Sequence, residues 1–255
     1  MATKNGAGTP RWSHYLGYVK SQSKMPGRIS PPERANQPII TISRQAGAGA
    51  HAIASELVPL LEARAAGGPR PWAVFDRNIV DRVIEEHHLP ADAARFMPED
   101  RINEIGDTLD TLFGLHPSAW SLVRKTAETI RRIANLGNMI LFGRAGNVVT
   151  ENLPNALHVR LVGSVEGRIE YIKATKQLGQ LAAADYVNRE DLGRKRYVKK
   201  YFGKDIDDPL LYHLVINTGQ VPFAAAARII ADALDELFAP TSGIQEPART
   251  PRQIR

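Results

Sequence analysis

Short runs of β-branched and aromatic residues alternate with longer helical patterns between residues 37 and 238, and this rhythm constrains the fold more than any other feature. The runs predict five strands, at 38–43, 72–75, 138–142, 156–162 and 212–217. Helical spacing predicts helices at 48–66, 77–87, 181–201 and 223–238, and another that begins near Ser164. Apolar strands separated by helices are typical of a parallel sheet covered on both faces. We therefore expect a three-layer α/β fold with a five-stranded parallel sheet.

One segment interrupts the alternation, and two others lie outside it. Residues 91–136 show only helical patterns, so we expect an inserted helical region between the second and third strands. Residues 1–36 and 239–255 are punctuated by Pro, Gly and Ser, which predicts tails on either side of the main domain at 37–238. The aromatic stretch from Trp12 to Val19 is the exception, and we expect it to dock on the domain or on a neighbouring subunit.

The charge of the chain argues against several classes of protein. The 33 Lys and Arg exceed the 27 Asp and Glu by six, but residues 1–36 hold six basic and one acidic residue, and residues 239–255 hold three and one. The domain between them carries −1, which disfavours a uniformly basic nucleic-acid-binding domain. The absence of cysteine excludes thiolate nucleophiles and cysteine-based metal sites. Without a bilayer-spanning apolar run or a secretory signal, we expect a cytoplasmic enzyme or binding protein with no membrane partner.

The loop after the first predicted strand has the composition of a phosphate-binding loop. It reads Ser-Arg-Gln-Ala-Gly-Ala-Gly-Ala-His over residues 43–51 and leads directly into a helix. The N–H groups of a tight glycine turn, together with a helix N-terminus, form an anion cradle. The candidate phosphate-binding residues are Ala46, Gly47, Ala48, Gly49, Ala50 and His51. The usual lysine is missing, since Ala50 stands in its place, and Ala52 stands where a magnesium-binding hydroxyl is expected.

Six segments together resemble the cytidylate kinase-like family. They are Ile42–Ala54, Val74–Val80, Ile140–Asn147, Leu157–Val162 with Arg168, Asn188–Tyr197 and Leu214–Thr218. They occur in order and cover the chain from about residue 37 to 238. The resemblance implies a P-loop NTPase-type fold of the nucleoside monophosphate kinase superfamily. In such a fold residues 91–136 would form the acceptor side and residues 178–208 a helical lid.

The resemblance also implies donor and lid residues. Arg44 and the backbone of residues 46–51 would bind the phosphates of ATP, and Arg168 would lie near the donor nucleotide at the entrance to the lid. Asp191 and Arg194 match the family's Asp-x-x-Arg lid motif, within a segment at 189–204 that holds seven basic and two acidic residues. Basic residues that close over migrating phosphate are what phosphoryl transfer requires.

Three residues that follow the second and third strands would hold the acceptor: Asp76, Arg77 and Arg144. For Asp76 the role of N-cap on the next helix stays open, whereas an arginine fork such as Arg144 suits bidentate contact with phosphate. In cytidylate kinases the third-strand segment reads Gly-Arg-Asp, but Ala145 follows Arg144 here, which puts cytosine specificity in question. Arg44, Arg144, Asp191 and Arg194 are the catalytic candidates.

The resemblance implies a phosphotransferase that moves the γ-phosphoryl of ATP to a nucleoside monophosphate, CMP or dCMP first. Mg²⁺ is expected to enter with ATP, and the histidines show no metal-binding spacing. Two alternatives stay open: a nucleotide-binding protein with little or no turnover, because the loop lysine is absent, and a kinase for another small acceptor. A nucleic-acid-binding module built on the basic tails is the least favoured.

Overall fold

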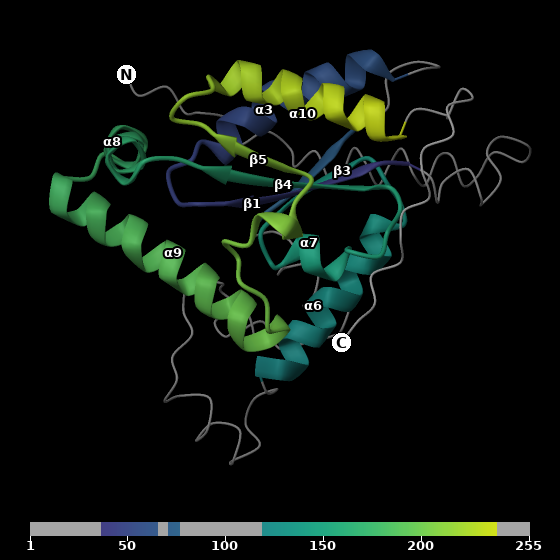
Figure 1. The fold of residues 1–255 in the computed structure, drawn as a ribbon, viewed down its shortest axis with the longest axis horizontal. Coiled ribbons are helices and arrows are strands. Elements are labelled where there is room, and N and C mark those ends of the chain that lie inside the picture. The colour runs from purple at the N-terminus through teal and green to yellow at the C-terminus, as the bar shows by residue number, and fades with distance from the viewer. Residues whose placement is uncertain (1–36, 66–70, 77–118, 239–255) are drawn as a thin grey trace, which may run out of the picture.

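A computed structural model of the chain describes residues 37–65, 71–76 and 119–238 (Figure 1). Its elements, in chain order, are β1 Ile39–Arg44, α3 Ala50–Arg64, β2 Ala73–Phe75, α6 Ala119–Ala134, β3 Met139–Phe142, α7 Gly146–Val149, β4 Ala156–Val162, α8 Val165–Lys176, α9 Gln180–Phe202, the 3-10 turn Pro209–Leu211, β5 Leu214–Asn217 and α10 Phe223–Phe238. The two tails, the Trp12–Val19 segment, the helix expected at 77–87 and residues 91–118 of the insertion lie outside the described residues.

The five strands form one parallel sheet in the order β2-β3-β1-β4-β5, which confirms the predicted α/β fold. The strand boundaries lie within two residues of those expected. The fifth strand begins at Leu214 and not at Tyr212, so that boundary was wrong. The reason is local, because the Tyr212 N–H bonds to the Pro209 carbonyl and closes the 3-10 turn before the strand.

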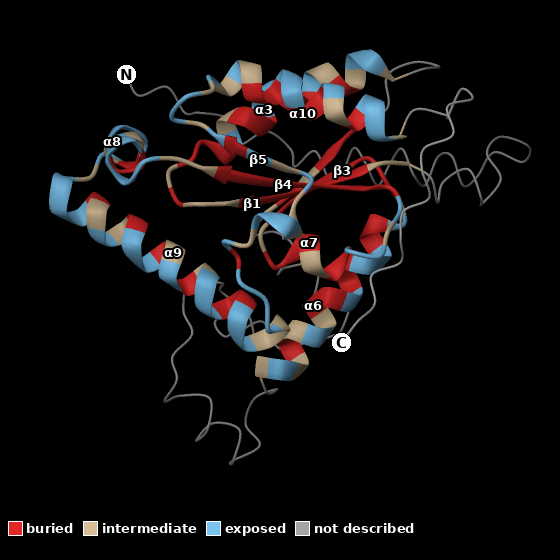
Figure 2. Cartoon of the chain, viewed as in Figure 1, coloured by how far each residue is buried: buried red, intermediate tan, exposed pale blue. Residues whose placement is uncertain are grey.

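Apolar residues of the sheet pack on both of its faces, as the colours of Figure 2 show for the strands. Successive residues of a strand point to opposite faces. Ile40 and Ile42 of β1 therefore pack with Ile53 of α3 and Ile230 of α10 in one core. Ile39 packs with residues of α6 in the other core. The sheet is thus the middle layer between α3 with α10 and the helices on the α6 side (Figure 1).

Helix α9 is the longest described helix, and it runs obliquely past the sheet from α8 toward α6 (Figure 1). Its buried residues include Ala183 and Val187 near α8, and Tyr197 and Val198 farther along. It ends at Gly203, whose left-handed conformation (φ 68°) lets its N–H bond to the Lys199 carbonyl. Among the described helices, none combines the length and apolarity needed to cross a membrane.

Candidate functional site

The loop between β1 and α3 turns on two glycines in the left-handed region, Gly47 with φ 81° and Gly49 with φ 74°. Both sites are also crowded, because a Cβ on Gly47 would collide with the Arg168 backbone and one on Gly49 with the Phe223 ring. Helix α3 begins immediately afterwards at Ala50, so its first N–H groups lie at the carboxyl end of the sheet. This is the geometry of an anion cradle. Ala50 itself is buried in the apolar core and adds no charge.

A carboxylate ties helix α9 to this loop. Asp191 accepts hydrogen bonds from the Ala46 N–H and from Arg168 Nη1, both at 2.6 Å. Arg168 also donates to the carbonyls of Ala46 and Gly163, at 2.9 and 3.0 Å, and its side chain is only 6% exposed. The structure therefore brings Arg168 and Asp191 to the loop, where they join it to α8 and α9. The ATP contact of Arg168 stays a prediction, since its guanidinium binds protein groups here.

The other predicted lid residue, Arg194, lies one turn farther along α9. Its Nη2 donates to Glu190 Oε2 at 2.7 Å, and its Nη1 lies 3.5 Å from Asp191 Oδ1. Glu190 is itself buried, at 4% exposure. The guanidinium is thus held between two carboxylates of its own helix, with its side chain 11% exposed.

Three predicted site residues meet at the carboxyl ends of β1 and β2. Asp76 Oδ1 accepts from Arg44 Nη2 at 3.3 Å, and Asp76 Oδ2 lies 2.9 Å from His51 Nε2. The Arg44 guanidinium lies 5.7 Å from the centroid of the Phe142 ring. Asp76 therefore contacts both Arg44 and His51 beside the loop between β1 and α3. Arg77, and the helix that Asp76 would cap, lie outside the described residues.

The segment after β3 adopts an uncommon backbone conformation. Gly143, Arg144 and Ala145 all have positive φ, at 66°, 56° and 50°. Such residues cost of order 1–3 kcal/mol each when they are not glycine, and they cluster at functional sites. Arg144 is buried, and Ala145 packs with Tyr197 and Val198 of α9. The position of the missing aspartate is therefore apolar and covered by α9.

A cleft of about 230 Å³ opens between the loop that follows β1 and helix α9. Its lining comprises four basic residues, two acidic residues and three others: Arg44, Arg160, Arg194, Lys195, Asp191, Asp207, Gln45, Leu192 and Ile206. In the described chain, Arg144 and Arg168 do not line it. The cleft lies at the carboxyl ends of β1 and β4, with Arg160 of β4 in its floor, and this is the edge where open α/β sheets bind ligands.

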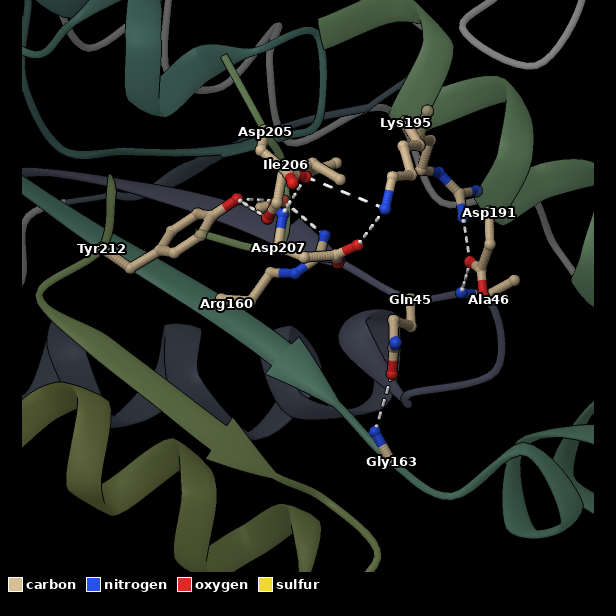
Figure 3. A network of polar contacts seen from close by, with 12 residues as sticks. Gln45, Ala46, Arg160, Gly163, Asp191, Lys195, Asp205, Ile206, Asp207 and Tyr212 are labelled. Atoms are coloured by element: carbon tan, nitrogen blue, oxygen red, sulfur yellow. Dashed lines mark hydrogen bonds and ion pairs between the residues drawn. The ribbon is translucent and has the colours of Figure 1, made fainter. Parts of the chain in front are cut away.

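Arg160 of β4, which no motif singled out, lies at the centre of a polar network in this cleft (Figure 3). Its Nη1 donates to Ser43 Oγ and its Nη2 to Asp207 Oδ1, both at 2.9 Å. Lys195 Nζ donates to the other Asp207 oxygen at 3.0 Å. Burial alone would raise the pKa of Asp207, but the hydrogen bond from Lys195 and the charges of Lys195 and Arg160 lower it below its ordinary value. Asp207 is therefore ionised at neutral pH.

The register of the sheet explains why these residues meet. Ser43 lies opposite Arg160 and Thr41 opposite His158 in the β1–β4 pair, on the face away from α3 and α10. The sequence carries a sign of this arrangement, because polar and aliphatic residues alternate along β4. His158 and Arg160 alternate with three buried aliphatic residues of β4, namely Leu157, Val159 and Leu161.

These features define a class of protein. A parallel sheet with a tight glycine loop after its first strand, and a basic helix tied over that loop, is the architecture of a P-loop-type kinase fold. The sequence profile of the cytidylate kinase-like family matches residues 39–220. The chain belongs to this family.

Individual relatives are distant. The cytidylate kinase of Methanocaldococcus jannaschii is 25% identical over 163 residues, which are 63% of this chain and 91% of that protein. The cytidylate kinase of Thermoplasma acidophilum is 26% identical over 123 residues, 48% of this chain and 64% of that protein. The crystal structure of an uncharacterized protein from Eubacterium ventriosum aligns with 78% of this chain and 99% of its own, with a TM-score of 0.57 and 17% identity. That likeness concerns the fold alone.

Proposed function

We propose that this chain is an ATP-dependent phosphotransferase that moves the γ-phosphoryl group to a nucleoside monophosphate, with CMP or dCMP as the first candidates. One observation carries the proposal. The cleft between the phosphate loop and α9 is lined by four basic and two acidic side chains, at the edge of the sheet where ligands bind. Membership of the cytidylate kinase-like family and the two similar cytidylate kinases support the acceptor class.

The chemistry needs positioned positive charge more than covalent catalysis. An oxygen of the acceptor phosphate attacks the γ-phosphorus in line, the bond to the β-phosphate oxygen breaks, and ADP leaves. Negative charge spreads over the equatorial oxygens, where positioned cations stabilise it. Arg44 comes from the end of β1 and Arg194 from α9, so a phosphate between them is contacted from two sides. The attacking phosphate is largely ionised at pH 7, because its second pKa is about 6, so no strong general base is required.

Mg²⁺ is proposed to enter with ATP. This ion keeps several waters and binds through one or two carboxylates together with substrate phosphates. Among the described residues, no group of three or more His, Asp or Glu side chains could hold a metal, so these residues provide no separate cage. When bound with ATP, Mg²⁺ neutralises charge on the phosphate oxygens.

The test is the release of ADP from Mg-ATP by the full chain, with a panel of nucleoside monophosphates as acceptors. We expect CDP or dCDP as the product, and we expect Arg194→Ala to lower kcat/KM by about a hundredfold or more, because it removes a cation from the reacting phosphates. Arg64→Ala is the matched control, since Arg64 pairs with Asp232 and Asp235 between α3 and α10. Unchanged kcat/KM in Arg194→Ala would contradict the proposal, and phosphorylation of a small alcohol alone would replace it with a different kinase.

A nucleotide-binding protein without turnover is the second candidate. Two observations favour it. Ala50 replaces the loop lysine, and Asp191 already binds the Ala46 N–H, Arg168 and Arg194, which are groups that a phosphate would use. Calorimetric titration with ATP, combined with the ADP-release assay, separates the two candidates, because ATP binding without ADP release on any acceptor supports the binding protein alone.

A further inference from the structure

Arg160 is the most enclosed basic side chain of the cleft. It is 6% exposed, against 11% for Arg194, 12% for Arg44 and 53% for Lys195. A guanidinium stays protonated in proteins, and a charge this enclosed is costly unless it is paired. Its described hydrogen-bond partners are one hydroxyl, that of Ser43, and one carboxylate, that of Asp207.

These partners do not use all the N–H donors of the Arg160 guanidinium. An arginine side chain has five N–H donors in a planar fork, and the bonds to Ser43 and Asp207 use two of them. The Asp207 carboxylate also accepts a hydrogen bond from Lys195, so Arg160 shares its one described anionic partner with a second cation. The remaining N–H groups belong to a residue that lines the cleft. Arg160 lies on β4, opposite Ser43, which is the residue before Arg44.

The carboxylate partner belongs to the segment that follows the lid helix. Asp207 lies five residues beyond the end of α9, and the neighbouring Ile206 carbonyl accepts from the Tyr212 hydroxyl at 2.8 Å. Arg160 thus joins the floor of the cleft, which is β4, to the chain that leaves the lid (Figure 3). An anion that competed for Arg160 would break the ion pair between β4 and this segment.

We propose that Arg160 is a phosphate-binding residue and that a phosphate in the cleft takes the place of Asp207 as its anionic partner. The lining supports this, because four basic and two acidic side chains leave a net charge of +2, which complements a phosphate dianion. A strand residue with a fixed guanidinium suits bidentate contact with phosphate oxygens. The inference rests on the proposed function only in taking a phosphate group as the ligand.

The experiment is calorimetric titration of the full chain with inorganic tripolyphosphate at fixed ionic strength. Arg160→Met removes the charge and keeps the length of the side chain, and we expect Kd to rise about tenfold or more, since a charge-assisted hydrogen bond is lost. Arg160→Lys is expected to restore part of the affinity. Arg64→Met, which also removes an arginine paired with carboxylates, is expected to bind within about twofold of the parent. A folded Arg160→Met that binds like the parent overturns the proposal.

A second pair of variants decides the question if Arg160→Met does not fold. Asp207→Asn should bind tripolyphosphate more tightly than the parent, because the competing carboxylate is gone. Adding Arg160→Met to Asp207→Asn leaves no buried unpaired charge, because Lys195 is half-exposed and stays near Asp205, and it should weaken binding about tenfold relative to Asp207→Asn. Equal affinity of these two variants overturns the proposal.

Binding of tripolyphosphate requires no turnover, so this proposal and the proposed function fail separately. Binding that depends on Arg160 in a protein inactive on every acceptor refutes the kinase and retains the phosphate contact. If the chain is an active kinase and its Arg160→Met variant binds tripolyphosphate like the parent, the kinase is retained and the Arg160 contact is refuted.

Discussion

His158 makes the stability of the fold depend on pH in a way that can be calculated. Its ring is buried in the sheet, with Nδ1 2.9 Å from Thr41 Oγ1 and the ring stacked 5.0 Å from that of His213. Burial, and to a lesser extent the charge of His213, lower the pKa of His158 from 6.5 to about 4. Protonation therefore costs more in the folded chain than in the unfolded chain.

The sign follows from proton binding. Between pH 6.5 and about 4 the unfolded chain binds a proton at His158 that the folded chain does not. The folded state keeps the full benefit of a neutral His158 above pH 6.5, loses stability as the pH falls, and loses no more below about pH 4. Each pKa unit corresponds to about 1.4 kcal/mol, so the whole loss is about 3 kcal/mol, of which about 2 kcal/mol falls between pH 7.5 and 5.

Urea unfolding of the full chain and of His158→Gln at pH 7.5 and pH 5 measures this loss. Glutamine can still bond to Thr41 but does not titrate, so the difference between the two proteins cancels the other titrating groups. We expect the parent to lose about 2 kcal/mol more than the variant on acidification. His213→Gln is the control and should keep most of the effect, because burial is the larger cause. Equal losses in the parent and His158→Gln would refute the reasoning.

Other predictions test the loop and its attachments. Gly49→Ala should lower the free energy of unfolding by about 2 kcal/mol in a urea titration, because φ is 74° and the added Cβ meets the Phe223 ring. Gly179→Ala is the control. Its added Cβ meets no neighbouring atom within 4 Å, so it should cost less than about 1 kcal/mol. Asp191→Asn should speed hydrogen exchange at the Ala46 amide, since a charged acceptor becomes neutral, and an unchanged exchange rate would contradict that contact. Ser164→Ala should cost about 1 kcal/mol by thermal or urea unfolding, because the Ser164 side chain caps α8, and no loss would contradict the cap.

The sheet was predictable because its signals are local. Strand β4 and helix α10 have the predicted boundaries at both ends, since a bounded aliphatic run and an amphipathic Ala-rich pattern each mark a structure on their own. The start of β5 was not predictable in this way. The apolar pattern includes Tyr212, and nothing in it reveals that the Tyr212 N–H is used by the turn at Pro209.

The residues of the site also differ in whether the signal for their arrangement is local in sequence. The glycine turn at Gly47 and Gly49 was predictable, because consecutive residues of one loop make the cradle. The contact of Arg160 with Ser43 spans 117 positions in sequence and depends on the register of two strands, which no single segment encodes. Helical periodicity does not reveal either that Asp191 reaches the Ala46 N–H, 145 positions away.

The charged residues at 189–204 show why net charge alone misleads about binding. The run at 189–204 predicted free cations for phosphate, yet Arg194 is paired with Glu190 and Asp191, and Lys195 with Asp205 and Asp207. A phosphate that entered the cleft would therefore displace carboxylates, and its affinity would be the gain from its own contacts less the loss of these ion pairs. In such a site the acidic residues influence the affinity as well as the basic ones. Neutralising an acid such as Asp207 should then strengthen phosphate binding, because the competing ion pairs of Arg160 and Lys195 are lost.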